Sequence, residues 1–217
     1  MKTTDQLRAD VGHELAWEPK LDERHIVVSV SDGAVTLDGH VPTYGQKVHA
    51  VRAVERVSGV RAVADELEVR LAGAHVRDDT DIAQSISQRL AWNAVIPKDS
   101  VKAEIAGGTV TLRGTVEWEY ERREAARLAR DVVGVRNVHN LIELKQRPAA
   151  KTVERQIASA FGRQASLDAR QIQVSVHNSK AVLSGHVHSL AEQRIARIAA
   201  YAAPGITSVE SHLTVEP

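Results

Sequence analysis

One nine-residue segment occurs three times in this 217-residue chain and constrains its fold more than any other feature. The copies are GAVTLDGHV at residues 33–41, GTVTLRGTV at 108–116 and SKAVLSGHV at 179–187. In each copy a further glycine follows the strand glycine after 20 residues, giving the pairs Gly39 and Gly59, Gly114 and Gly134, and Gly185 and Gly205. A constant interval in copies that otherwise differ indicates a shared backbone plan.

Alignment on these glycines divides the chain into repeats. Residues 5–70 match 80–145 at a shift of 75, and residues 80–145 match 151–216 at a shift of 71, without a gap. We therefore predict three units at residues 1–70, 80–145 and 151–217, joined by linkers at 71–79 and 146–150. Units of this size are near the lower limit for an independent core.

The order of hydrophobic patterns is the same in every unit. Apolar residues spaced four apart predict an amphipathic first helix, and an alternating pattern then predicts a strand. The dipeptides at 32–33, 107–108 and 178–179 suit a two-residue type I′ turn, which leads into the repeated strand. In unit one this turn pairs Val28 with Leu37 and Val30 with Val35 on one face. A helix with small inward residues and a closing strand complete the unit.

These patterns predict an α+β chain of three tandem αββαβ two-layer sandwich domains. Each has a three-stranded sheet with two helices on one face. The patterns do not determine the strand order. The other sheet face has no predicted cover, so it is open to solvent, packed on another unit, or used for binding.

The combination of a first helix, a V-x-L-x-G-x-V hairpin strand and a helix followed by Gly-Val resembles the BON domain, three times over. The matching residues are Val35, Leu37, Gly39, Val41, Gly59 and Val60; Val110, Leu112, Gly114, Val116, Gly134 and Val135; and, less closely, Ala181, Leu183, Gly185, Val187, Gly205 and Ile206. The resemblance implies a non-enzymatic module that associates with phospholipid membranes in envelope maintenance and osmotic or general stress. Triple-domain relatives are described as transport-associated.

The glycines are predicted to serve the fold rather than a ligand. We expect Gly39, Gly114 and Gly185 to face inward on a strand, beneath a helix too close for a side chain. Gly59, Gly134 and Gly205 are expected to be the left-handed residues that end the second helix.

Tryptophans are candidate contacts for lipid or for a partner protein. Trp17 and Trp92 occupy equivalent places just after the first helix, where unit three has Arg163. An indole suits a membrane interface, but it can equally close the end of a core, and the sequence leaves both alternatives open. Trp118 and Tyr120 lie among acidic residues at a helix start, which disfavours an anionic membrane at that point.

The second helix of unit two carries a row of cations. Arg123, Arg127 and Arg130 share one helix face and are candidates to meet lipid phosphates. The alternative, which we favour, is a solvated face with Glu124 and Asp131 as local partners.

No pattern predicts an enzyme, a cofactor or a metal site. Residues shared by all three units are apolar positions, turns and glycines, whereas potential nucleophiles and acids differ between copies. His186 and His188 supply only two of the ligands that zinc needs, and cysteine is absent.

The charge balance and the low aromatic content of the chain limit the kinds of partner it is expected to bind. The 28 basic and 28 acidic side chains leave no net charge, and the sheet lacks repeated aromatic residues, so we expect no nucleic-acid binding. The expected partners are a phospholipid surface or envelope and stress proteins, or else the chain is a protein–protein scaffold that self-associates without lipid. The start lacks an apolar signal core, which predicts a cytoplasmic chain as written, or a periplasmic one if an export signal precedes it.

Overall fold

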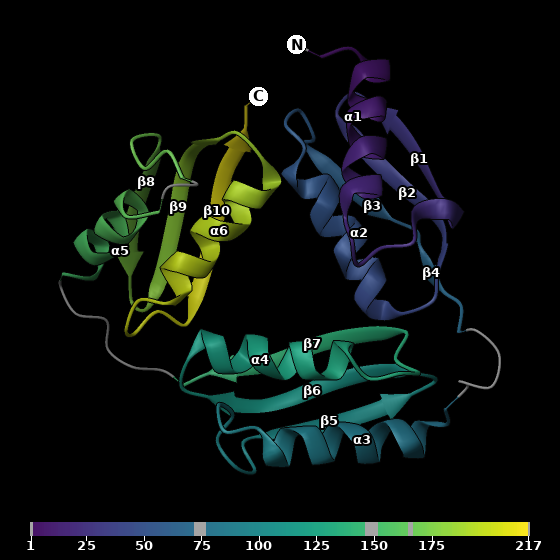
Figure 1. Cartoon of the computed structure of the whole chain (residues 1–217). Helices are drawn as coiled ribbons and strands as arrows, with labels where there is room; N and C mark the ends of the chain where they lie inside the picture. Colours follow the sequence, from purple (N-terminus) through teal and green to yellow (C-terminus); the bar gives the residue numbers. More distant parts are fainter. Residues whose placement is uncertain (1, 72–76, 146–151, 165–166, 217) are drawn as a thin grey trace.

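The computed structural model describes residues 2–71, 77–145, 152–164 and 167–216, which form three α+β units arranged as a triangle (Figure 1). The expected linker 146–150 and residues 72–76 of the expected linker 71–79 lie outside the described residues.

Each unit has the predicted order of elements. Unit one contains α1 (Thr4–Trp17), the 3₁₀ turn η1 (Glu23–His25), β1 (Ile26–Ser31), β2 (Ala34–Val41), α2 (Tyr44–Arg56), β3 (Ala62–Asp65) and β4 (Glu68–Val69). Unit two contains α3 (Asp79–Trp92), β5 (Val101–Ala106), β6 (Thr109–Val116), α4 (Glu119–Arg130) and β7 (Asn137–Leu144). Unit three contains α5 (Val153–Gly162), β8 (Ile172–His177), β9 (Lys180–Val187), α6 (Leu190–Tyr201) and β10 (Ser208–Val215).

The repeated strand lies at the centre of each sheet. It pairs antiparallel with the strand before it and parallel with the strand after it, in the orders β1-β2-β3, β5-β6-β7 and β8-β9-β10. The predicted register is confirmed, because Val28 pairs with Leu37 and Val30 with Val35. Both residues of the first turn have positive φ, 49° at Asp32 and 80° at Gly33, as a type I′ turn requires.

The closing strand of unit one differs from the expected single strand. It is divided into β3 and β4, which pair with β2 in the same register. The Asp65 carboxylate accepts a hydrogen bond from the Leu67 backbone N–H at 3.2 Å. The equivalent bond of unit two, from the Ile142 N–H to Asn140 Oδ1 at 3.2 Å, leaves β7 continuous, so this bond alone does not explain the interruption.

The helices of each unit cover one face of its sheet, and the core lies between them. The central-strand leucines Leu37, Leu112 and Leu183 are fully buried. Residues on the opposite sheet face, such as Asp38 and Arg113, are exposed. Within the described residues, this face is therefore open to solvent and not packed on another unit.

The strand glycines have a different physical cause from the expected one. Gly39, Gly114 and Gly185 have φ of 112°, 140° and 117°, a region that disfavours any side chain. A Cβ added at Gly114 would overlap the backbone carbonyl oxygen of Ser100, just before the neighbouring strand. The expectation of a covering helix is therefore wrong: the paired strand's own backbone excludes the side chain.

The glycines after the second helices also need a correction. Gly59, Gly134 and Gly205 do have positive φ, but α2 already ends at Arg56, and Gly59 lies in the following turn. In that turn the Val60 N–H donates to the Val57 carbonyl at 3.2 Å, with the glycine at the third position. A positive φ there is the mark of a type II turn.

The second helix of each unit faces the centre of the triangle, whereas α1, α3 and α5 lie on the outside (Figure 1). Units one and three meet where α2 contacts α6 and where Leu190 packs against the core of unit one. Tyr44 of unit one packs against the core of unit two, and Tyr201 packs against the cores of units two and three. The three second helices thus form the junctions between all pairs of units.

Candidate functional site

The two equivalent tryptophans stand out in solvent. Trp17 ends α1 and is 84% exposed, and Trp92 ends α3 and is 80% exposed. The alternative that they close the core is therefore wrong. In unit three Arg163 takes this place and donates a hydrogen bond to Ser159 Oγ at 2.7 Å. Two of the three units therefore present a bare indole to solvent.

Trp118 has a different setting from the other two indoles. It is the N-cap residue of α4 and is half-buried. With Tyr120, Ile198 and Ala202 it lines a cavity of about 480 Å³ between α4 and α6. Trp118 therefore belongs to the junction between units two and three.

The predicted arginine face of α4 points into a second cavity. Arg123, Arg127 and Arg130 line a space of about 440 Å³ whose opposite wall is α2 of unit one, with Tyr44 and Arg52. The face thus borders another unit, while Arg123 and Arg127 remain exposed to solvent. The expected local partners are present: Arg127 contacts Glu124 at 2.7 Å and Asp131 at 3.3 Å, and Arg130 contacts Asp131 at 3.3 Å.

Arg52 is the residue of this cavity that the sequence analysis missed. Among the described residues no carboxylate lies within ion-pair distance of Arg52 or of Arg123. Burial lowers the pKa of the Arg52 guanidinium, and the charges of Arg130, Arg194 and Arg123 lower it further against the opposing effect of Glu55. Burial is the largest cause of the lowered pKa, and the three neighbouring arginines add a positive local potential.

The repeat alignment could have pointed to Arg52 as a candidate site residue. The shift of 75 places Arg52 at the position of Arg127, and the shift of 71 places Arg123 at the position of Arg194. Each of these two positions therefore carries an arginine in two of the three units, with Ile198 and Val48 in the remaining ones. That these helices face one another follows from the packing of the units, which no local pattern contains.

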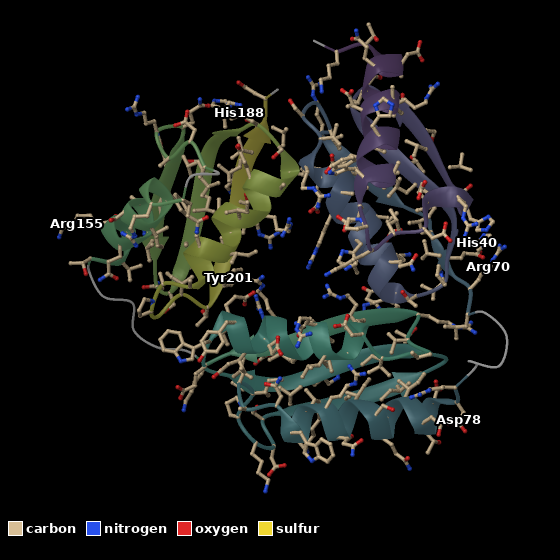
Figure 2. The ribbon with its side chains drawn as sticks, in the orientation of Figure 1. His40, Arg70, Asp78, Arg155, His188 and Tyr201 are labelled. Atoms are coloured by element: carbon tan, nitrogen blue, oxygen red, sulfur yellow. The ribbon has the colours of Figure 1, made fainter. Side chains whose placement is uncertain are left out.

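The other two junctions balance their charges. Between units one and three, Arg194 pairs with Glu55 at 2.9 Å. Between units two and three, Arg122 pairs with Glu119 at 2.6 Å and lies over the ring of Tyr201, 4.7 Å from its centroid. Figure 2 labels Tyr201 at the end of α6 beside α4. Burial raises the pKa of the Glu119 carboxyl, and the charge of Arg122 opposes the shift.

The structure also locates the histidines considered for metal binding. The His186 imidazole lies 2.8 Å from Thr214 Oγ1 and 2.9 Å from a Glu216 carboxylate oxygen. Within the described ranges, no three histidine, aspartate or glutamate side chains come together as a metal site would require. No helix in those ranges is both long and apolar enough to cross a bilayer.

Comparison with known proteins follows the same three-part division. The family model described as "BON domain" matches residues 3–70, 78–146 and 149–217. The Osmotically-inducible protein Y of Escherichia coli (strain K12) is 31% identical over 143 residues, which cover 64% of this chain and 71% of that protein. An uncharacterized protein in the gshII 5′ region of Anaplasma centrale is 28% identical over 123 residues, covering 55% of this chain and 82% of that protein.

Two solved structures of CdsD, a structural protein of the Type III secretion system of Chlamydia trachomatis, also align with the chain. One is 20% identical and covers 96% of this chain and 91% of its own, with a TM-score of 0.28. The other, a C-terminal domain, is 19% identical and covers 100% of both chains, also with a TM-score of 0.28. A likeness at that TM-score carries no weight for fold or function.

Proposed function

Because the chain belongs to the BON domain family, whose model matches all three of its units, we propose that it is a non-enzymatic binding protein of the osmotic-stress response that associates with phospholipid surfaces of the cell envelope. The name of the Escherichia coli relative supports the link to osmotic stress. The exposed indoles support the link to lipid.

The observation that carries the proposal is the exposure of Trp17 and Trp92. Both are more than three-quarters exposed at the same place in two units, although burial of an indole in water-excluding surroundings is strongly favourable. An indole at a bilayer interface buries its ring and keeps its N–H hydrated. These two side chains are therefore suited to the interface of a membrane.

The arginines of α4 do not serve this contact in our proposal, because they face the cavity beside α2. Lipid association then rests on apolar insertion more than on attraction to anionic headgroups. We accordingly expect a weak dependence on ionic strength, in contrast to the strong screening of exposed charges.

The experiment is tryptophan fluorescence of the full chain with vesicles of phosphatidylcholine alone and with added phosphatidylglycerol. We expect the emission to shift to shorter wavelength on both, and the shift to disappear in the double variant Trp17→Ser, Trp92→Ser. Trp118 remains in that variant as an internal control, because it is half-buried at a junction. An unchanged wild-type emission on both vesicles would refute the lipid proposal.

A second candidate function is a scaffold for protein–protein contact or self-association without lipid. It is favoured by the same exposed indoles together with Val27 and Leu141, which are exposed on the outer sheet faces of two units. Sedimentation equilibrium distinguishes this candidate. The scaffold would be favoured if the chain assembles with rising concentration, the double tryptophan variant does not, and the wild type does not bind vesicles.

A further inference from the structure

The cavity between α2 and α4 has an uneven charge lining. Four arginines line it, Arg52 from unit one and Arg123, Arg127 and Arg130 from unit two, against the single carboxylate of Glu124. Tyr44 and Tyr120 supply two phenol rings, and Val48, Ala126 and Val138 supply a small apolar part. Its volume of about 440 Å³ is within the range of small-ligand sites.

The ion pairs divide these arginines into two groups. Arg127 and Arg130 have carboxylate partners in Glu124 and Asp131. Arg52 and Arg123, from opposite walls, have no carboxylate partner within ion-pair distance among the described residues. The excess positive charge therefore lies between two units, where a single bound group would touch both.

This arrangement differs from what the chain does at its other junctions. There Arg194 pairs with Glu55, and Arg122 pairs with Glu119 of the same helix. Like charges gathered in partly buried surroundings repel one another. The lowered pKa of Arg52, caused by burial and by three neighbouring arginines, is consistent with that repulsion. An anion from outside the chain would supply a counter-charge to both arginines.

We propose that the cavity binds a soluble anion that carries two or more phosphate-type charges, held by Arg52 of unit one and Arg123 of unit two. A guanidinium presents a planar fork of N–H donors that matches phosphate oxygens two at a time. Arg127 and Arg130 add to the attraction while they remain tied to Glu124 and Asp131. The phenols of Tyr44 and Tyr120 form the walls.

The position of the cavity favours a soluble anion over a lipid headgroup. The exposed indoles stand at the ends of α1 and α3, whereas the cavity lies between α2 and α4, which face each other at the centre of the triangle (Figure 1). A headgroup that is still anchored in a bilayer therefore has to enter between two units. A free phosphate compound has no such restriction.

The test is isothermal titration calorimetry of the full chain with sodium tripolyphosphate, in a buffer free of phosphate and sulfate. We expect one saturable site per chain. Removal of a charge-assisted hydrogen bond to phosphate corresponds to roughly a tenfold to hundredfold loss of affinity. Arg52→Gln and Arg123→Gln are each expected to weaken binding by about that factor, and Arg52→Lys to weaken it less than Arg52→Gln.

The matched control is Arg155→Gln, which makes the same change of net charge. Arg155 is exposed on α5, at the outer side of unit three, as Figure 2 shows. Its replacement should leave the affinity unchanged. Equal weakening by Arg155→Gln would mean diffuse attraction to the whole chain and would overturn the proposal, as would the absence of saturable binding. Circular dichroism of each variant establishes that it is folded.

Two further experiments ask whether the anion is a lipid headgroup or a soluble compound, and whether the cavity binds independently of the exposed indoles. Dependence on Arg52 that appears only with phosphatidylglycerol vesicles, and never with tripolyphosphate, would assign the cavity to a lipid headgroup and overturn the proposal. The double variant Trp17→Ser, Trp92→Ser should bind tripolyphosphate like the wild type. Failure of the lipid proposal therefore leaves this one standing, and the reverse also holds.

Discussion

Helix α4 takes part in two junctions that are built on opposite electrostatic plans. Toward unit three, Arg122 is neutralised by Glu119 and covered by the ring of Tyr201. Toward unit one, Arg123 and Arg52 line a shared cavity, and no described carboxylate pairs with either. The same helix thus has one side whose charges are compensated within the chain and one side with an excess of positive charge.

This difference in charge pairing suggests that the junction with unit three stabilises the fold, whereas the junction with unit one is suited to bind a ligand. A buried charge is tolerated when it is paired and hydrogen-bonded, and it is costly when it is not. The junction with unit three pairs Arg122 with Glu119, although the buried Glu119 Oε2 has no hydrogen-bond partner among the described residues. At the junction with unit one no described carboxylate pairs with Arg52 or Arg123, and the counter-charge that would complete it is an anion. Variants on the two sides of α4 should accordingly behave differently.

The largest effect is expected from the strand on which α4 rests, because both junctions depend on it. Gly114→Ala places a Cβ against the Ser100 carbonyl oxygen at a φ of 140°. We expect a loss of about 3 kcal/mol or more from overlap and backbone strain. Urea unfolding of the full chain measures it.

Gly107→Ala is the matched control for that substitution. Gly107 also has positive φ, 57°, but nothing lies within 4 Å of an added Cβ. Backbone conformation alone should cost about 1 kcal/mol there. Equal losses in the two variants would show that the close approach to Ser100 is unimportant.

The fold of each unit was predictable because its determinants are local and are repeated three times. The spacing of Leu7, Val11 and Leu15 defines a helix face whatever surrounds it, and the turn at Asp32 and Gly33 sets the register of its hairpin. The reason for Gly39 was not predictable. Its φ and the approach of a neighbouring strand's backbone depend on pairing geometry that a hydrophobic pattern does not contain.

The candidate site was predicted only in part, for a related reason. Arg123, Arg127 and Arg130 were placed on one helix face, and their pairing with Glu124 and Asp131 follows from helical spacing. The face is solvated as expected, since Arg123 and Arg127 are exposed, but the sequence does not show that it also borders a cavity whose other wall is α2. Arg52 belongs to a different unit. Its approach depends on contacts between units that are far apart in the sequence.

The second prediction compares a tyrosine that is packed at the junction with unit three with one that lines the cavities on both sides of α4. Tyr201 packs against the cores of units two and three and lies beneath Arg122, so Tyr201→Ala should cost about 2 kcal/mol through lost packing and a lost cation–π contact. Tyr120 lines the cavities and is 57% exposed, so Tyr120→Ala should cost no more than about 0.5 kcal/mol. Both values are measured by urea unfolding. Similar losses would remove the contrast between the junctions.

The third prediction is that substitutions of two arginines near the cavity change the stability of the chain in opposite directions. In buffer without multivalent anions, Arg52→Gln should stabilise the chain by about 0.5 kcal/mol, because it relieves repulsion. Arg194→Gln should destabilise it by a similar amount, about 0.5 kcal/mol, because it breaks the pair with Glu55. Thermal unfolding at low salt and at high salt checks both, since screening should reduce each effect. Destabilisation by Arg52→Gln would mean that its charge is compensated within the chain.

The smallest effect is the pH dependence of the stability that two glutamates of α4 contribute, and we predict its direction only. Burial raises the pKa of Glu119 above its ordinary 4.5, so the stability that the wild type has relative to Glu119→Gln is complete below pH 4.5 and is lost as pH rises through the folded value. A hydrogen bond from Arg127 lowers the pKa of Glu124, so its contribution relative to Glu124→Gln is complete above pH 4.5 and is lost as pH falls. The urea midpoints of the three proteins are measured between pH 3.5 and pH 7.5. The difference between the wild type and each variant should change with pH in opposite directions for the two glutamates, and each change should be small. Parallel slopes would mean that Glu119 is ionised as easily as Glu124, and that the junction with unit three is no drier than the cavity facing unit one.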